Sequence, residues 1–243
     1  ARVLATLQPT PGTGSPAWDS FESWSEVAAY YKQLSVVQCD SDPALVQTIQ
    51  RVTEGAGDLL SRIRAISQYV QSLRYVSINR DLGMGFGYRP RKATEVHAKG
   101  WGDCKDKANL MCAMLREIGV TAYLASAHTR LGRLVSPDWP NPQQFNHAIV
   151  AICVGESVDL PSVVNTDRFG RVLFFDATDE YTVLGDLPHA IQGSKTHIEA
   201  EGSNELVVLP ELGFEENRRI KRTMRMTLAA DGSVTGSGSF EAD

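Results

Sequence analysis

The spacing of apolar residues predicts four helices in the first half of the chain. The clearest pattern is an apolar stripe with a helical period, which runs from Leu59 through Ile63 and Ile66 to Val70. A serine or an aspartate stands directly before each helical stretch and can accept hydrogen bonds from the first N–H groups of the helix. The predicted helices cover residues 24–34, 43–53, 59–73 and 104–118.

In the second half of the chain, apolar and polar residues alternate, which predicts β-strands. After a short strand at residues 74–78, strands are expected at residues 120–127, 145–154, 171–177 and 206–209. Residues 128–143 and 178–202 are expected to be loops, the second with one helical turn near residues 187–191. A group of helices followed by a meander of strands indicates an α+β fold with an antiparallel sheet.

The two ends of the chain differ from this middle part. Residues 1–19 are rich in Pro, Gly, Ser and Thr, which is typical of a linker. Beyond residue 217, charged and apolar residues alternate on both sides of Asp231-Gly232, a hairpin turn signal. We therefore expect a linker with helices over residues 1–57, a core over residues 58–215 and the start of a truncated β domain over residues 216–243.

Composition and charge narrow the class of protein. The 243 residues are 42% hydrophobic and 22% charged, which is ordinary for a globular chain that buries its own core. A net charge of -5 leaves no basic footprint, which argues against a nucleic-acid partner. The sequence has no apolar run as long as a membrane span. Because the chain starts at Ala1 without Met or a signal peptide, we expect an excised piece of a longer protein.

The four cysteines do not form a metal-binding or redox motif. Cys39, Cys104, Cys112 and Cys153 contain no C-x-x-C pair and no zinc-ligand spacing, so no metal or cofactor is expected. Cys104 and Cys112 would lie about 12 Å apart on one helix, too far to bridge. A disulfide between Cys39 and Cys153 is left open.

The chain is organised around the turn that leads into the fourth helix. Gly100 and Gly102 precede Cys104, which opens the helix, and Asp103 and Asp106 stand in the positions of a capping box. The positive end of a helix favours a thiolate over a thiol, while the charges that flank Cys104 oppose one another. The bland alternative is a cysteine buried in the apolar core.

A second glycine-rich stretch precedes this turn. Residues 82–90 carry three glycines at alternate positions, a spacing that does not fit a dinucleotide-binding loop. We expect a flexible loop beside a cleft, with a plain turn as the alternative.

Two further residues can work with the thiol. His147 lies in a predicted strand and Asp176 ends the next strong strand, so antiparallel pairing can join the imidazole to the carboxylate. His147 would take the thiol proton, Asp176 would orient the ring, and Cys104 would attack an acyl carbonyl to form a thioester. The backbone N–H of Cys104 would donate to the oxyanion.

Each of these residues has an alternative reading. His147 can be a core histidine, Asp176 can cap a turn, and His97 is a rival base. Asp179 and Glu180 are rival carboxylates in the loop that follows. We expect the remaining histidines at the surface, namely His128, His189 and His197.

These motifs resemble those of bacterial transglutaminase-like proteins. Gly102-Asp103-Cys104-Lys105-Asp106-Lys107-Ala108 is similar to the cysteine motif of that superfamily, and Asn146-His147-Ala148 and Asp176-Ala177-Thr178 are similar to its histidine and aspartate motifs, in the same order. The resemblance covers roughly residues 59–180. It implies a papain-like cysteine-peptidase fold in which Cys104, His147 and Asp176 form a catalytic triad.

The flanks resemble one bacterial subgroup, in which such a core lies between β-rich domains in exported proteins. This implies a periplasmic or extracellular location, flanking domains in a longer parent protein, and a peptide or protein substrate. Eukaryotic relatives depend on calcium, but no acidic loop here resembles a calcium site. Trp101 and Tyr75 are the candidates for a second oxyanion donor.

The resemblance implies a thiol-dependent amide hydrolase or acyl transferase. Cross-linking members carry Gln before the cysteine and Trp after it, whereas this chain has Asp103 and Lys105, which favours hydrolysis. The alternative function is a peptide- or glycan-binding module that keeps the fold without turnover.

Overall fold

The computed structural model describes residues 21–77, 87–212 and 220–242. The chain divides into two compact units, Ala1–Glu211 and Leu212–Asp243. The expected linker at residues 1–19 lies outside the described residues, as do residues 82–86 of the glycine-rich loop. The three-segment organisation expected from the sequence stays a prediction.

The four predicted helices are present, and each starts at a side-chain cap. Ser23, Asp42, Asp58 and Asp103 each accept a hydrogen bond from a backbone N–H in the first turn of the helix that follows. Short polar side chains at these positions stop the helix from extending backwards because they satisfy its free donors. The helices are α1 (Trp24–Ser35), α2 (Pro43–Val52), α3 (Leu59–Ser72) and α5 (Cys104–Glu117).

A fifth helix, α4 (Ala93–Lys99), is not predicted by the sequence. Its N-cap residue, Lys92, makes no side-chain capping bond, and seven residues are too few to display a helical period. The helix ends at Gly100, whose φ of 69° is in the left-handed region that glycine adopts without strain.

A six-stranded antiparallel sheet forms the other half of the first unit. Its strand order is β5-β6-β4-β3-β7-β8, so β4 lies between β3 and β6. A separate parallel pair joins β1 (Arg74–Tyr75) to β2 (Trp101–Gly102). The strands of the large sheet are β3 (Ala122–Ala127), β4 (His147–Cys153), β5 (Val163–Thr166), β6 (Gly170–Phe175), β7 (Lys195–Ile198) and β8 (Leu206–Val208).

The α+β fold class is confirmed, but the loop predicted over residues 178–202 is wrong in part. Residues 187–191 form turns without a helix, and the same segment contains strand β7. The β7 sequence is Lys-Thr-His-Ile, which has no alternating apolar pattern to mark a strand. Its polar residues Thr196 and His197 are nevertheless buried. Strand β5 was missed for a related reason, since only its two valines are apolar.

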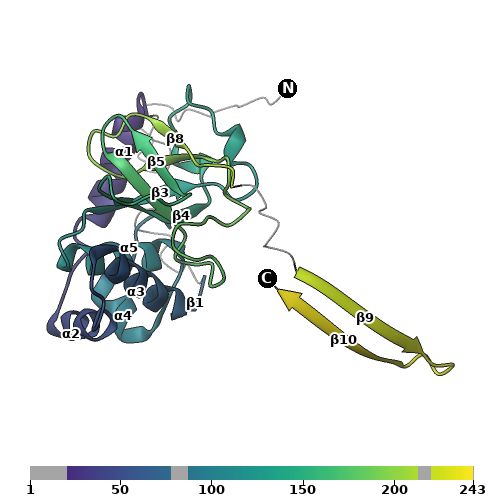
Figure 1. Cartoon of the computed structure of the whole chain (residues 1–243). Helices are drawn as coiled ribbons and strands as arrows, with labels where there is room; N and C mark the ends of the chain where they lie inside the picture. Colours follow the sequence, from purple (N-terminus) through teal and green to yellow (C-terminus); the bar gives the residue numbers. More distant parts are fainter. Residues whose placement is uncertain (1–20, 78–86, 213–219, 243) are drawn as a thin grey trace. The chain divides into compact units, whose positions relative to one another are not determined.

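One apolar cluster joins the helices to the sheet. Most of α5 is buried, and its side chains pack with α2, α3 and α4 on one side and with strand residues such as Val150 and Phe175 on the other. Figure 1 shows α2, α3, α4 and α5 gathered on one side of the sheet. Helix α1 uses a second cluster, in which Trp24 and Tyr31 pack with Val135 and Phe145. The helix that starts at Cys104 is therefore the central element of the unit.

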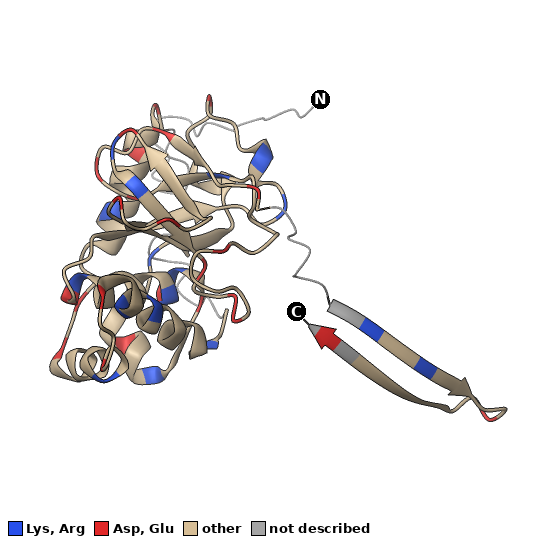
Figure 2. Cartoon of the chain, in the orientation of Figure 1, with Lys and Arg blue, Asp and Glu red and all other residues tan. Residues whose placement is uncertain are grey.

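The second unit is the predicted hairpin, formed by β9 (Ile220–Leu228) and β10 (Val234–Ala242). Asp231 accepts from the backbone N–H of Ser233 at 2.9 Å, and Gly232 has a φ of 84°. In the first unit, charges of both signs are interspersed over the helices and loops, and the sheet strands carry few of them (Figure 2). Among the described residues, no helix has the length and apolar character needed to cross a bilayer.

Candidate active site

The turn before Cys104 is fixed by reciprocal hydrogen bonds. The Asp103 side chain accepts from the backbone N–H of Asp106 at 3.2 Å, and the Asp106 side chain accepts from the backbone N–H of Asp103 at 3.1 Å. Gly102 has no room for a side chain, because a Cβ would lie 2.6 Å from the Cβ of Asp106. The predicted capping box is confirmed, and it holds the Cys104 thiol at the positive end of α5.

The charges that flank Cys104 in sequence are engaged in local pairs. The Asp106 side chain is fully buried, accepts from the backbone N–H of Arg91 at 2.7 Å and forms an ion pair with the Arg91 guanidinium. Lys105 forms an ion pair with Asp103. These residues therefore fix the backbone of the turn, and the balance of free charge around the thiol cannot be read from their order in the sequence.

His147 and Asp176 are hydrogen-bonded across the neighbouring strands β4 and β6. His147 Nε2 lies 2.7 Å from Asp176 Oδ2, and the two side chains are 11% and 5% exposed. The other carboxylate oxygen, Oδ1, accepts from the Thr178 backbone N–H at 2.9 Å and from its hydroxyl at 2.7 Å. The two sequence interpretations of Asp176 are therefore both met, since it contacts the histidine and also caps the following turn.

The charges around His147 favour its protonated form. Burial alone would lower the pKa of His147, but the hydrogen bond and charge of Asp176, together with those of Cys104, raise it from 6.5 to about 10. Burial would likewise raise the pKa of Asp176, yet His147 and Thr178 lower it. The pair is thus a carboxylate and an imidazolium over a wide pH range.

Cys104 completes this group of three residues. Its thiol is free and half-buried at the start of α5, and its charge is among the causes that raise the pKa of His147. The Nε2 atom of the His147 ring faces Asp176. Of the three residues that the sequence singled out, the structure joins His147 to Asp176 by a hydrogen bond and places Cys104 at the start of α5.

A parallel strand pair runs beside the Cys104 turn and carries the two predicted oxyanion donors. The backbone N–H of Val76 donates to Gly102 at 3.0 Å. Burial raises the pKa of Tyr75, and the charges of Cys104 and Asp176 raise it further, so this phenol lies within their field. Trp101 instead stacks between Arg91 and Lys99, at 5.1 and 5.3 Å from its ring. Tyr75 is the better placed of the two.

The rival residues have other partners. His97 lies on α4 with its Nε2 3.0 Å from the Thr48 hydroxyl. Asp179 accepts from the Tyr181 backbone N–H at 2.9 Å, and Glu180 is exposed. None of these contacts involves Cys104 or His147.

The expectation that His197 is a surface residue is wrong. His197 is 0% exposed on β7, with its ring centroid 5.1 Å from that of Trp24. Only one of its sequence neighbours, Ile198, is apolar, so a local pattern cannot reveal that the strand is buried on both faces. His128 is half-buried and His189 is exposed.

Sequence reasoning also missed two residues behind the site. Lys107 is 1% exposed, and its ammonium group donates to the backbone carbonyls of Gln71 and Leu73. The Gln71 side chain donates to the carbonyls of Asp179 and Thr182. A lysine at a core position of an otherwise apolar helix was the available signal, since a lysine is rarely buried without partners.

The structure offers no donor set for a metal within its described residues, where no three His, Cys, Asp or Glu side chains are suitably grouped. All four cysteines are free, so the Cys39–Cys153 disulfide left open by the sequence is absent from this structure.

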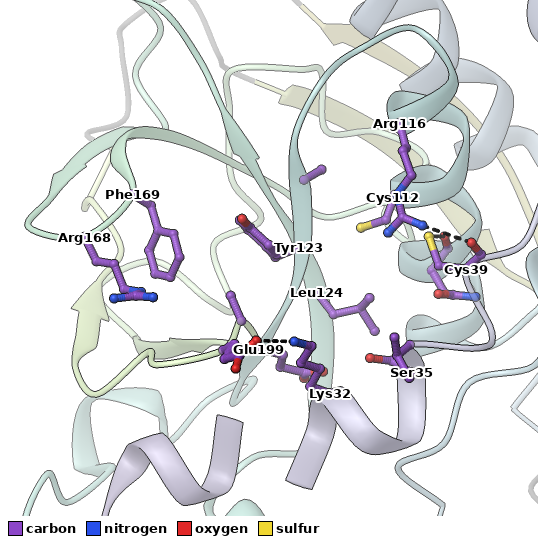
Figure 3. Close-up of a pocket in the computed structure, with 15 residues that line it drawn as sticks. Lys32, Ser35, Cys39, Cys112, Arg116, Tyr123, Leu124, Arg168, Phe169 and Glu199 are labelled. Carbon is purple, nitrogen blue, oxygen red and sulfur yellow. Dashed lines mark hydrogen bonds and ion pairs between the residues drawn. The ribbon is translucent and has the colours of Figure 1, made fainter. Parts of the chain in front are cut away.

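A separate pocket of about 400 Å³ lies further along α5 (Figure 3). Asn109, Cys112 and Arg116 of α5 line it, together with Cys39 and Glu199. Cys104, His147 and Asp176 are not among its lining residues. The pocket is thus distinct from the group of three residues.

The core of the chain is similar to known proteins. Residues 46–158 match the family model of the transglutaminase-like superfamily, a range that includes Cys104 and His147. No curated protein sequence matches the chain.

Two solved structures are also similar. One is a candidate protease from Parabacteroides distasonis, with 16% identity and a TM-score of 0.51, and the similarity covers 76% of this chain and 31% of that one. The other is a candidate cysteine protease from Cytophaga hutchinsonii, with 14% identity and a TM-score of 0.40, and the similarity covers 96% of this chain and 56% of that one. This chain therefore spans only part of each of these proteins. At such identities the first similarity shows a shared fold.

Proposed function

We propose that the protein is a thiol-dependent amide hydrolase or acyl transferase that acts through Cys104, His147 and Asp176, because residues 46–158 match the family model of the transglutaminase-like superfamily. The observation that carries the proposal is the 2.7 Å hydrogen bond between His147 and Asp176, beside a thiol whose charge helps to raise the pKa of the same imidazole. A cysteine nucleophile requires a base within reach and a group that orients this base, and these three side chains fill the three roles.

In the proposed resting state the Cys104 proton is already on His147, in keeping with the raised pKa of this imidazole. The thiolate attacks the carbonyl carbon of an amide, a C–S bond forms, and the carbonyl π pair moves onto oxygen. His147 then returns the proton to the amide nitrogen, the C–N bond breaks, and the amine leaves a thioester on Cys104. Asp176 keeps the ring oriented and stabilises the imidazolium.

Water or an amine completes the cycle. It attacks the thioester while His147 takes its proton, the C–S bond breaks, and the Cys104 thiolate is released. The backbone N–H of Cys104 donates to the oxyanion, because the first N–H groups of a helix have no acceptor within the helix. Tyr75 is the second donor in this proposal, since its phenol lies within the field of Cys104.

Hydrolysis is the favoured outcome. Asp103 and Lys105 occupy the positions at which cross-linking relatives carry Gln and Trp, and here both serve as an ion pair in the capped turn. The substrate is a peptide or related amide. By its family layout, the protein is bacterial and exported, and fractionation of cells that make the full-length parent protein tests this location.

The deciding experiment is alkylation by iodoacetamide between pH 4 and 9, with peptide mass spectrometry to follow each thiol. We expect Cys104 to be labelled rapidly at pH 5 to 6 and this labelling to collapse in His147→Ala. Burial raises the pKa of Cys39, Cys112 and Cys153, so these thiols serve as internal controls that react only at alkaline pH.

A Cys104 that reacts only at alkaline pH, like the control thiols, would overturn the catalytic proposal. The peptide- or glycan-binding module would then be the better reading. With a substrate in hand, Cys104→Ala should abolish turnover without loss of the fold, and retained turnover would contradict the mechanism.

A further inference from the structure

Lys107 is a buried cation three residues beyond Cys104 on α5. Its Nζ atom donates to the carbonyl of Gln71 at 3.1 Å and to that of Leu73 at 3.0 Å. These carbonyls lie at the end of α3, where backbone acceptors lack partners within the helix and the helix dipole is negative. The lysine is therefore a specific ligand for this helix end, a task that an apolar side chain of the same length cannot perform.

One branch from Lys107 leads to the strand beside the thiol. Leu73 is followed by β1, whose ends are bonded to the Cys104 turn: the Arg74 N–H donates to Gly100 at 3.1 Å, and the Val76 N–H donates to Gly102 at 3.0 Å. The bonds run from α5 through α3 and β1 back to the residues just before Cys104. This closed ring fixes Tyr75 relative to the nucleophile.

A second branch leads to the carboxylate. The Gln71 side chain donates from Nε2 to the carbonyls of Asp179 and Thr182, both at 2.6 Å. Asp179 lies three residues after Asp176, in the loop that Asp176 itself caps through Thr178. Gln71 thus joins Lys107, through its backbone, to the loop that carries the carboxylate.

Negative charges near Lys107 compensate in part for the burial of its ammonium group. Burial lowers the pKa of Lys107, while the negative charges of Asp176 and Glu180 oppose that effect. A buried ammonium without such partners would be costly. The lysine and the Asp176 carboxylate therefore lie within one another's field.

We propose that Lys107 is a positioning residue that holds the Asp176 loop and the Tyr75 strand in place against the Cys104 turn. The proposal rests on the function proposed above. Lys107 does not touch the reacting atoms, and it acts through Gln71 on the Asp176 side and through Leu73 on the Tyr75 side.

The test compares Lys107→Met, Gln71→Met and the double variant with the wild-type chain. Methionine keeps the length of both side chains and removes their donors. Lys92→Met is the control, because Lys92 is a lysine whose side chain is 58% exposed. Hydrogen exchange of the amides and the pH profile of Cys104 alkylation are measured for every variant.

In Lys107→Met, we expect faster exchange in residues 74–76 and 176–182, with strand β4 unchanged. Alkylation of Cys104 at pH 5.5 should fall roughly tenfold, within the range that a misplacement of about 1 Å can cost. In Gln71→Met, we expect faster amide exchange in residues 176–182 and unchanged exchange in residues 74–76. In the double variant, residues 176–182 should exchange no faster than in Lys107→Met, because both changes act on one route.

Unchanged exchange in both segments of a folded Lys107→Met variant would overturn the proposal, as would a uniform rise throughout the core. If Lys107→Met does not fold, Gln71→Met decides, since the half-buried Gln71 side chain can be changed without removing a buried charge. If wild-type Cys104 shows no labelling in acid, the proposed function fails, and the exchange pattern still decides the role of Lys107.

Discussion

Two histidines flank the same strand of the sheet and meet opposite environments. His147 on β4 pairs with Ala127 of β3, and His197 on β7 pairs with the adjacent Ser126. The pKa of His147 is raised to about 10, whereas burial lowers the pKa of His197 to about 4, although the backbone of Ser203 and of Trp24 opposes it. Two residues of one type at neighbouring positions in the sheet are therefore a cation and a neutral ring at pH 7.

The difference comes from the partners, since both rings are largely shielded from solvent. His147 has a carboxylate at 2.7 Å, and the charge of Cys104 also raises its pKa. The His197 ring packs against Trp24 with the two ring planes tilted by 41°, and neither of its nitrogens has a hydrogen bond of good geometry to the residues that the structure describes. Burial disfavours charge in both cases, and only His147 has an anion to offset it. The comparison thus separates the candidate active site from a merely buried histidine.

Removing the carboxylate should have the largest effect. In Asp176→Asn, burial would act on His147 with only Cys104 left to oppose it, so the pKa of His147 should fall from about 10. Cys104 alkylation at pH 5.5 should drop on the order of 100-fold, about 2.7 kcal/mol in activation free energy. NMR titration of His147 and the alkylation rate are the two measurements.

The matched control is Asp179→Asn, which alters a carboxylate three residues away that accepts from the Tyr181 backbone N–H. This variant should leave both readouts at their wild-type values. An Asp176→Asn protein in which His147 still titrates near pH 10 would show that the carboxylate is not what distinguishes the two histidines.

The pH dependence of stability is a second readout of the same raised pKa. The folded-state pKa of His147 lies above its unfolded value, so its contribution is complete below pH 6.5 and is lost as the pH rises through about 10. His147→Gln should remove this decline, which is on the order of a few kcal/mol at about 1.4 kcal/mol per pKa unit. Urea unfolding at pH 6, 8 and 10 measures the slope. Equal slopes in both proteins would contradict the raised pKa.

The sequence predicted those parts of the fold that local chemistry determines. The caps Ser23, Asp42, Asp58 and Asp103 place the helix starts because each bond is made within one turn. The strands with strong apolar runs were also predicted, because such a run is a local feature of the sequence. Helix α4 and strands β5 and β7 were missed, since tertiary contacts stabilise short or polar segments that lack such a pattern.

The candidate site likewise contains features that local sequence patterns predicted and contacts that they could not predict. Cys104 at a capped turn, and His147 and Asp176 on adjacent strands, follow from spacing and strand pairing. The bonds of Lys107 to Gln71, and of Gln71 to residues 179 and 182, cross 36 or more positions in the chain. No local pattern encodes such contacts, and the same limit explains why His197 was expected at the surface.

His197 offers the smallest effect and the opposite sign. Its folded-state pKa lies below its unfolded value, so the unfolded chain takes up the proton first and stability falls as the pH drops from 6.5 through about 4. His197→Phe keeps an aromatic ring beside Trp24 and removes the titration, so the loss of stability between pH 7 and pH 4.5 should be smaller by about 1–2 kcal/mol. Urea unfolding at both pH values measures this, with the exposed His189→Gln as control. A variant with the same acid-induced loss as the wild type would mean that His197 is charged when buried, and the contrast with His147 would then no longer depend on the carboxylate.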